Sequence, residues 1–469
     1  MSPGEWCLRL DTEDFLTPES DQALADLLRV LEERGSRAVF PLTASKLRSW
    51  LRRGRSDLVA ALARQQVGYH SDTHSLHPTI AEEMAPLGWR QGQRAFAARE
   101  EAGFDLVRRH FGPPVCYTQP GGNWTAAALP VLRSWGVTLE YSEGWNSYLD
   151  FGARPCHYLG VLHWSAPVLA PKPFLSQLPQ CLPRAVEQVL EGARCWKPGD
   201  PPLNVVAHPT ELCTTAFWDA VNFRRGAMPP PALWRPAPLR PPLEIHEAVA
   251  AFARYLDLLR EQGLRLVSLE ELTARHADRA PGTRLGPAAV QALARATAAD
   301  VDYRCSGGLA LSAAEIAWVL VHAAVRRQEP IPQRVLEGPP EPPPPTVAGS
   351  VSRQALWQAA AALRQHLAAT GCVPTAVPLG RAAAAPAPVV RALAEALLNE
   401  GGQEFSLRPT LLAAERHVKA EADLHWDWPV FPEGFAPRGL RQQALLQCWT
   451  LKPAPLEAPV QWERWGGQP

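Results

Sequence analysis

Short apolar segments alternate with amphipathic segments over the first 275 residues, and this alternation constrains the fold more than any other feature of the chain. Four leucines between residues 24 and 31 follow the i, i+3, i+4, i+7 spacing of a helix face, and Gly35 ends that helix. A further helical stretch is expected between the strand at 37–40 and about residue 63, with other helices near 91–111, 126–135 and 245–262. Strands are expected near 6–11, 37–40, 67–70, 115–118, 137–141, 203–207 and 264–267. Repeated strand–helix units predict an α/β fold with a parallel sheet, most simply a barrel that closes near residue 278.

Composition limits the partners and the compartment. The 469 residues are enough for two or three domains, and 47 basic against 47 acidic residues give no reason to expect a nucleic-acid partner. No stretch approaches eighteen uninterrupted apolar residues, so we predict no membrane span. The nine cysteines include no CxxC pair, and the first residues lack a basic segment followed by an apolar run. We therefore expect a cytoplasmic protein.

The chain becomes rich in alanine and leucine after about residue 287, and there we predict a mainly α-helical C-terminal region. Residues 288–327 and 352–398 each show helix, loop and helix, which indicates a degenerate repeat of about 45 residues, and 406–453 is a more divergent third candidate. Unrelated helical hairpins are the alternative. The predicted domains are a barrel (1–278), a helical repeat-like unit (279–336), a proline-rich linker (337–347) and a helical repeat-like C-terminal region (348–469).

Acidic and histidine residues follow three of the predicted strands. An acidic cluster, Asp11-Thr12-Glu13-Asp14, ends the first strand, and His208 ends a late one. His70 and His74 are four residues apart, so a helical segment would place both imidazoles on one face, able to bind one metal ion. Sites in α/β folds form at this end of the strands. A carboxylate and two imidazoles are also a common catalytic metal set that leaves positions open for water.

These motifs, in this order, resemble the polysaccharide deacetylase family, also called the NodB-homology group or carbohydrate esterase family 4. His70, Ser71 and His74 match its H-[ST]-x-x-H motif, and Val205-Val206-Ala207-His208 approximates its late L-x-x-H motif. The acidic cluster has the D-x-E form of divergent members. The resemblance covers about residues 5–275. It implies a distorted (β/α)7-type NodB barrel and a metal-dependent hydrolase that removes an N-acyl (acetyl or formyl) group from an amino sugar or glycan precursor.

Roles follow from the motif positions and the chemistry of hydrolysis. We assign Asp11 as the general base, Glu13 with His70 and His74 as the metal ligands, and His208 as the general acid. Asp14 competes with Glu13 for the acidic ligand position, because side-chain alternation favours Glu13 only if the strand persists that far. The expected cofactor is a divalent metal, first of all Zn²⁺, with Co²⁺, Mn²⁺ or Ni²⁺ as alternatives.

One motif departs from the family pattern. The third family motif, R-x-P-Y-G, carries an arginine that orients the base, and here Thr118 stands at the position of that arginine. The base must then be oriented by another residue. The same stretch supplies the predicted substrate contacts, which are Tyr117, Pro120, Gly121, Asn123 and Trp124. Trp124 fits equally well as a wall of the site or as an ordinary core residue.

The C-terminal units resemble, weakly, pseudomurein-binding repeats, because Gly371, Pro374 and Val377 have the Gly-x-x-Pro-x-x-Val spacing. That resemblance implies a cell-wall glycan as a second partner. Two other functions stay open for the barrel. One is hydrolysis of a small non-sugar C–N bond, as in allantoinase-like relatives. The other is a catalytically inactive barrel that binds glycans or acts as a scaffold, which the absent arginine favours.

Overall fold

A parallel sheet forms the centre of the N-terminal half. The computed structural model describes residues 4–143, 147–152, 154–166, 169–170, 174–197, 200–325, 331–346 and 348–454. Strand β1 (Glu5–Leu10) runs parallel to β7 (Leu203–Ala207), β2 (Val39–Leu42) and β8 (Arg265–Leu266), and β3 (Gln66–Tyr69) runs parallel to β2. The carboxyl ends of these strands therefore lie along one edge of the sheet.

The sheet continues beyond β3 through Tyr117, which bridges in parallel to Tyr69 of β3 and to Glu140 of β4. Strand β4 (Leu139–Glu143) is parallel to β6 (Val161–Ala166), and β5 (Cys156–Tyr158) and β17 (Lys452–Pro453) add antiparallel strands. The amide of Leu169, after β6, donates to the carbonyl of Asn204 in β7 at 3.0 Å. No strand ladder of the described residues joins β6 to β7. The predicted α/β fold with a parallel sheet is thus confirmed, although the described strands do not close a barrel. Residues 4–278, the span of the predicted barrel, are referred to as the barrel.

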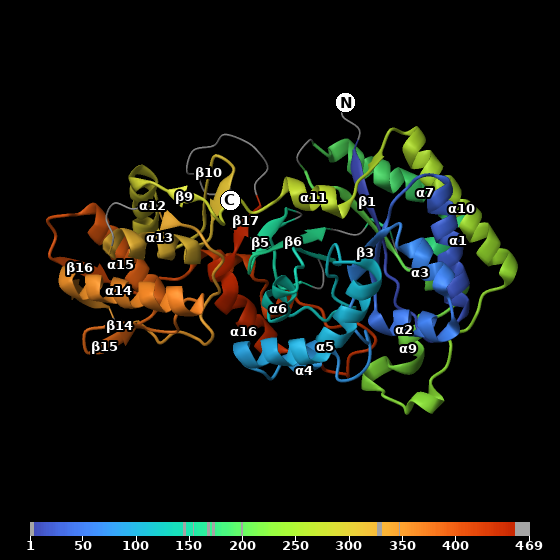
Figure 1. Ribbon diagram of the computed structural model, residues 1–469, viewed down its shortest axis with the longest axis horizontal. Helices are drawn as coiled ribbons and strands as arrows, with labels where there is room; N and C mark the ends of the chain where they lie inside the picture. Colours follow the sequence, from blue (N-terminus) through green and yellow to red (C-terminus); the bar gives the residue numbers. More distant parts are fainter. Residues whose placement is uncertain are drawn as a thin grey trace.

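Helices surround this sheet (Figure 1). Their bounds are α1 (Glu19–Glu33), α2 (Ala44–Arg53), α3 (Ser56–Leu62), α4 (Ile80–Met84), α5 (Trp89–Phe111), α6 (Ala128–Ser134), α7 (Phe174–Cys195), α8 (Thr210–Cys213), α9 (Trp218–Asn222), η2 (Arg224–Gly226), η3 (Pro231–Leu233), α10 (Pro242–Glu261) and α11 (Leu269–Arg275). Helix α7 was not predicted from the sequence, because Pro179 and Pro183 lie inside it and proline removes a helical N–H donor. The strand expected at 115–118 contributes only the bridges of Tyr117.

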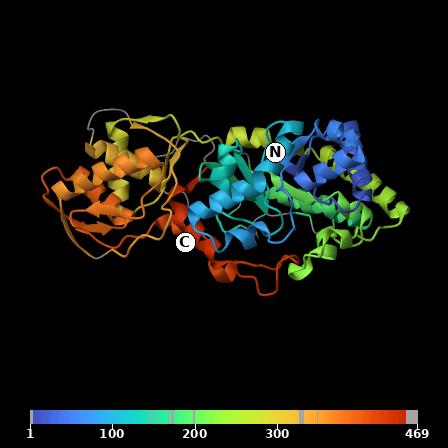
Figure 2. The ribbon, with the colours of Figure 1, turned by 60° about the horizontal axis from the view of Figure 1, so that its bottom comes forward.

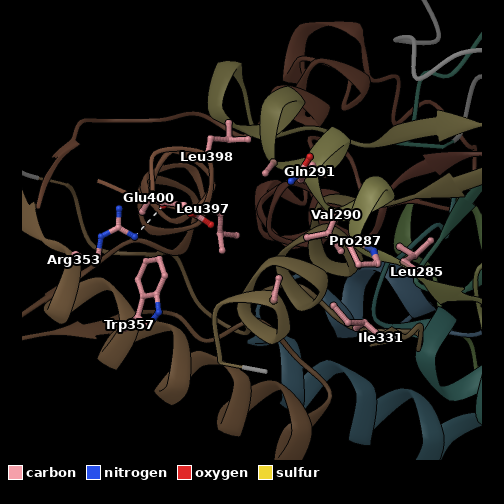
Figure 3. Close-up of a pocket in the computed structure, with 13 residues that line it drawn as sticks. Leu285, Pro287, Val290, Gln291, Ile331, Arg353, Trp357, Leu397, Leu398 and Glu400 are labelled. Atoms are coloured by element: carbon pink, nitrogen blue, oxygen red, sulfur yellow. Dashed lines mark hydrogen bonds between the residues drawn. The ribbon is translucent and has the colours of Figure 1, made fainter. Parts of the chain in front are cut away.

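Two units with the same order of elements follow the barrel. Each has a helix, a β-hairpin and a second helix, and α12 packs against α15 while α13 packs against α14. Their bounds are α12 (Pro287–Ala299), β10 (Arg304–Ser306), β11 (Leu309–Leu311) and α13 (Ala313–Val325), then α14 (Arg353–Thr370), β14 (Val377–Leu379), β15 (Ala382–Ala384) and α15 (Pro386–Leu398). The sequence predicts a loop between the two helices of each unit, and the structure has a β-hairpin at that place. A cavity of about 170 Å³ lies between α12, α14 and α15, with Trp357 and Arg353 on one side (Figure 3).

The end of the chain returns to the barrel. Residues 406–453, the candidate third repeat, contain two short turns, η4 (Ala413–His417) and η5 (Glu421–Asp423), then α16 (Arg438–Gln447) and η6 (Cys448–Thr450) before β17. They do not repeat the helix–hairpin–helix order. Figure 2 shows this segment, in orange and red, running along the barrel. It reaches η2, where the amides of Arg225 and Gly226 donate to the carbonyls of Pro429 and Val430. Short strands β9 (Arg284–Leu285), β12 (Ile331–Pro332), β13 (Gly349–Ser352) and β16 (Glu404–Leu407) pair around the helical units.

The start of the predicted proline-rich linker is docked on the barrel side of the molecule. Glu337 accepts hydrogen bonds from the side chains of Trp89 and Arg90 in α5, each at 3.0 Å. The side chain of Gln447 accepts from the amide of Gly338 and donates to the carbonyl of Pro339. None of the helices in the described part of the chain is long and apolar enough to cross a membrane.

Candidate metal centre

The carboxyl-terminal edge of the sheet gathers the predicted catalytic residues. Asp11 and Glu13 follow β1, His70 follows β3, and His208 follows β7. Because these strands are parallel neighbours, the residues that follow them meet at one edge. All four side chains are almost completely buried.

Glu13, His70 and His74 converge on one point. The Nε2 atoms of His74 and His70 lie 2.7 Å and 3.1 Å from Oε2 of Glu13. One potential ligand atom from each of the three residues lies within 4.8 Å of the others. The two imidazoles hold the pKa of the Glu13 carboxyl well below its ordinary value, although burial alone would raise that pKa. The carboxylate is therefore ionised and available as a ligand.

A loop, and not a helix, brings the two imidazoles together. Residues 70 and 71 have no regular structure, and Ser71 and His74 have left-handed backbones with φ of 69° and 56°. The amide of His74 donates to the hydroxyl of Ser71 at 3.0 Å, which stabilises the turn. The sequence argument from a shared helix face was thus wrong, although the two histidines it selected do meet.

Hydrogen bonds fix the orientation of both imidazoles. Nδ1 of His70 lies 2.6 Å from the hydroxyl and 2.9 Å from the carbonyl oxygen of Thr118. Nδ1 of His74 lies 2.5 Å from the hydroxyl of Ser75, which donates to Asp219 at 3.1 Å. Burial raises the pKa of Asp219 to about 6. With Nδ1 occupied on both rings, Nε2 of each faces Glu13, as metal coordination requires.

The predicted base, Asp11, and the predicted acid, His208, lie beside this cluster. Arg9 donates to both carboxylate oxygens of Asp11, at 2.7 Å each. Burial would raise the pKa of Asp11, but Arg9 and the neighbouring histidines lower it to about 2. Nε2 of His208 lies 3.8 Å from Asp11, and Nδ1 of the same ring lies 2.9 Å from the carboxylate of Glu211. Asp11 is therefore ionised, and His208 has its own carboxylate partner.

The choice between the two acidic ligand candidates follows from their contacts. One carboxylate oxygen of Asp14 accepts from the amides of Leu16 and Thr17, and the other accepts from the hydroxyl of Thr210. These bonds stabilise the loop that leads into α1. The structure brings Glu13, and not Asp14, to the two imidazoles.

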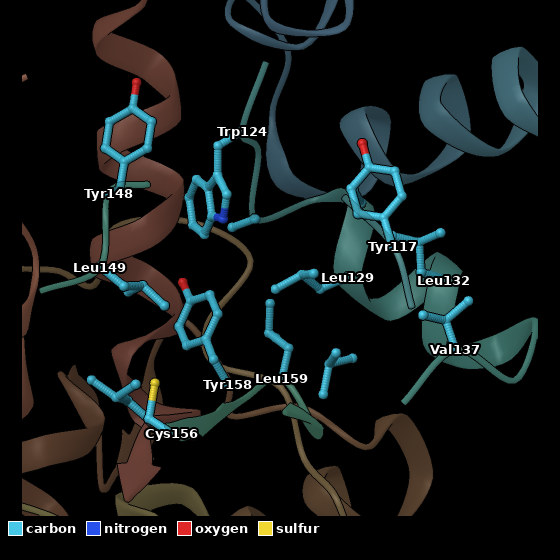
Figure 4. Packing of buried hydrophobic residues seen from close by; sticks show 14 of the residues in the cluster. Tyr117, Trp124, Leu129, Leu132, Val137, Tyr148, Leu149, Cys156, Tyr158 and Leu159 are labelled. Atoms are coloured by element: carbon cyan, nitrogen blue, oxygen red, sulfur yellow. The ribbon is translucent and has the colours of Figure 1, made fainter. Parts of the chain in front are cut away.

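Most of the predicted substrate contacts lie in the interior. The rings of Tyr117 and Trp124 pack in the main hydrophobic core, where Trp124 contacts Tyr148 and Tyr158 (Figure 4). Asn123 is buried and bonds to Ala81 and Pro120. Of the five, Gly121 alone is half-exposed, and the adjacent Pro120 is buried.

Sequence reasoning missed four residues of this site. Arg9 was detectable, because residues i and i+2 of a strand share a face and Arg9 precedes the predicted base Asp11 by two residues. Glu211 was detectable as the acid three residues after His208, within one turn. Trp218, whose indole N–H donates to Glu13 at 3.1 Å, and Asp219 follow no local pattern that links them to the histidines.

The donor set fits a divalent metal ion. It offers one ionised carboxylate oxygen and two imidazole nitrogens whose opposite ring atoms are already hydrogen-bonded. Three protein ligands with positions left for water are the usual composition of a catalytic zinc site. The buried residues around it support the orientation of each ligand.

Comparisons with known proteins find similarity in structure only. No protein-family model matches the chain, and no curated protein sequence matches it. A family 4 carbohydrate esterase from Streptomyces lividans, in complex with acetate, aligns over 58% of this chain and 96% of its own, at 18% identity and a TM-score of 0.30. Peptidoglycan deacetylase PdaC from Bacillus subtilis aligns over 58% and 92%, at 14% identity and a TM-score of 0.31. A family 4 pseudoenzyme from Bacillus anthracis aligns over 58% and 65%, at 13% identity and a TM-score of 0.31.

Proposed function

We propose that this protein is a metal-dependent hydrolase of the polysaccharide deacetylase type, which removes an N-acyl group from an amino sugar or glycan precursor. The observation that carries the proposal is the convergence of Glu13, His70 and His74 beside Asp11 and His208. A divalent ion held there would lower the pKa of a bound water and polarise the acyl carbonyl.

The chain's own residues move the protons. The carboxylate of Asp11 accepts a proton from the water that attacks the acyl carbon, and Arg9 holds that carboxylate in one orientation. Nε2 of His208 donates a proton to the leaving nitrogen as the C–N bond breaks. Glu211 favours the protonated imidazole by accepting from Nδ1. The products are a carboxylic acid and a free amine.

The deep burial of the metal-binding side chains supports a second candidate. Glu13, His70 and His74 are 2%, 1% and 3% exposed. A small substrate reaches such a centre more readily than an internal unit of a long polymer. Hydrolysis of a small non-sugar C–N bond is therefore the alternative.

Metal content and acyl release test the proposal together. The full chain should bind one Zn²⁺, lose it on His70→Ala and on His74→Ala, and keep it on His246→Ala, a control at an exposed site on α10. It should release acetate from N-acetylchitooligosaccharides, and Asp11→Asn should stop that release with zinc still bound. A wild-type protein that binds no zinc would refute the metal centre. Activity retained in Asp11→Asn would refute the base.

Glycan binding by the helical units is a separate proposal. The cavity between α12, α14 and α15 combines an indole, Trp357, with the polar side chains of Gln291, Arg353 and Glu400. Calorimetry with cell-wall glycan fragments on the full chain and on Trp357→Ala tests it. Equal affinities would exclude this cavity as the binding site.

A further inference from the structure

A segment far along the chain contacts the metal centre. The indole of Trp428 packs edge-on against His74, with ring centroids 5.6 Å apart and an interplanar angle of 78°. The side chain is half-buried and so keeps part of its surface exposed. This residue lies beyond both helical units, in the part of the chain that returns to the barrel.

Backbone and core contacts fix this segment in place. The carbonyls of Pro429 and Val430 accept hydrogen bonds from the amides of Arg225 and Gly226, at 2.9 Å each. Val430 is completely buried in a cluster with Phe15 and Trp218, and Trp218 itself donates to Glu13. Trp428 is thus held next to the metal ligands by at least three independent contacts.

Gly121 and Gly122, which follow Pro120, leave the space that the side chains of Trp428 and Phe431 occupy. A Cβ atom on Gly121 would lie 2.3 Å from the indole of Trp428, and one on Gly122 would lie 2.9 Å from the ring of Phe431. Gly121 also has a φ of +50°. Gly121, the one residue among the predicted substrate contacts that is not fully buried, therefore packs against the indole of Trp428.

A second half-buried aromatic ring stands on the acid side of the centre. Phe217 packs edge-on against His208, with centroids 4.9 Å apart and an interplanar angle of 87°. The proposed metal ligand His74 and the proposed acid His208 are thus each in contact with one half-buried aromatic ring. The aromatic surface at the centre therefore comes from two distant parts of the chain.

We propose that Trp428, together with Phe217, forms the substrate-binding wall of the metal centre and stacks against the apolar face of the acylated sugar ring. The C-terminal segment around Trp428 is then part of the active site. Binding sites combine rigid aromatic surfaces with a few polar groups, and an indole loses little conformational entropy on binding. The choice of an acylated sugar as the ligand rests on the proposed function. The position of Trp428 and Phe217 beside the two histidines does not depend on it.

Trp426 is a matched control in the same segment. Its indole packs against Tyr148, Phe431 and Phe435, and among the described residues its ring contacts do not include a proposed metal ligand. For the zinc-loaded full chain acting on N,N′-diacetylchitobiose, Trp428→Ala should raise KM roughly tenfold with kcat within threefold of wild type. Trp428→Phe should recover most of the affinity, and Trp426→Ala should leave KM unchanged. A wild-type KM in Trp428→Ala would overturn the proposal.

A second pair of variants leaves the indole in the chain. Gly121→Ala should displace Trp428 and raise KM as Trp428→Ala does. Gly152→Ala should not, because Gly152 has a similar φ of +63° but no atom within 4 Å of an added Cβ. Equal KM values for Gly121→Ala and Gly152→Ala would overturn the proposal.

Binding separates this proposal from the proposed function. If the wild-type protein binds zinc but hydrolyses none of the acetylated sugars, the function fails. The proposed wall is then tested by calorimetric titration of the zinc-loaded protein with N,N′-diacetylchitobiose. Weaker binding by Trp428→Ala than by Trp426→Ala supports the wall, and equal affinity or no binding by the wild type overturns it.

Discussion

Arg9 donates two 2.7 Å hydrogen bonds to Asp11, from Nε to Oδ1 and from Nη2 to Oδ2, and each of the two side chains is only 3% exposed. The arginine precedes the aspartate by two residues, so both lie on one face of the chain at the end of β1. Thr118, at the position where the family motif has its arginine, instead contacts His70. The residue that orients Asp11 therefore comes from β1, and Thr118 instead supports the imidazole of His70.

Removing this guanidinium should impair catalysis more than metal binding. For Arg9→Met we expect kcat to fall roughly a hundredfold, because a general base that loses its orientation loses most of its contribution. Zinc content should stay at the wild-type level, as Arg9 does not contact Glu13, His70 or His74 in the contacts described above. Steady-state kinetics with zinc analysis checks this.

Arg9→Lys is the control, because it keeps a cation beside Asp11. It should retain part of the kcat that Arg9→Met loses, if a cation at this position orients Asp11. Because Arg9→Met leaves a buried carboxylate without its partner, thermal unfolding of each variant must show a folded protein at the assay temperature. An unchanged kcat in Arg9→Met would contradict the positioning role.

Thr118 should act on metal affinity. Thr118→Val removes the hydroxyl beside Nδ1 of His70 but keeps the carbonyl. Loss of such an outer hydrogen bond typically weakens metal binding ten- to a hundredfold. Competition with a chelator of known zinc affinity measures the change. Thr125→Val is the matched control, because the Thr125 hydroxyl is buried without a hydrogen-bond partner among the described residues.

The sequence was sufficient for residues whose positions follow from strand order. Asp11, Glu13, His70 and His208 each end or follow a strand that its apolar pattern identifies, and parallel strands bring such residues to one edge. His74 was chosen for a helical reason, but left-handed backbones at Ser71 and His74 make the turn. Residue types alone do not specify that loop geometry, because a left-handed backbone is uncommon at any residue other than glycine, and serine is not among the residues enriched there.

Contacts between distant segments were beyond any local pattern. Trp428 meets His74 only because the chain passes through two helical units and then returns along the barrel. Tyr117 and Trp124 were proposed for the site from their place beside a motif, yet both pack in the main hydrophobic core. For Tyr117, alternation along the chain accounts for this: Cys116 belongs to a different core cluster, and the hydroxyl of Thr118 lies beside His70.

Lys452 of β17 should be essential for stability. Its ammonium lies 2.8 Å from both Glu315 of α13 and Asp278 after α11, and it is 3% exposed. It therefore joins the last strand, the first helical unit and the end of the barrel. Lys452→Met leaves two carboxylates without their cation, so we expect a loss of about 3–5 kcal/mol in the free energy of unfolding. Urea denaturation measures it, and a change below about 1 kcal/mol would contradict this role.

The same cluster predicts a pH dependence with a definite sign. Burial would raise the pKa of Asp278, but Lys452 and His157 lower it below its ordinary value. A carboxyl whose pKa is lower in the folded than in the unfolded chain stabilises the fold above its unfolded pKa of about 4. That contribution is lost as the pH falls through the folded pKa.

The stability difference between wild type and Asp278→Asn should thus be largest near neutral pH and shrink below about pH 4. Asp423→Asn, at an exposed position, should show no such trend. Denaturant unfolding between pH 3 and pH 7 tests this, and a difference that grows on acidification would contradict the assigned sign.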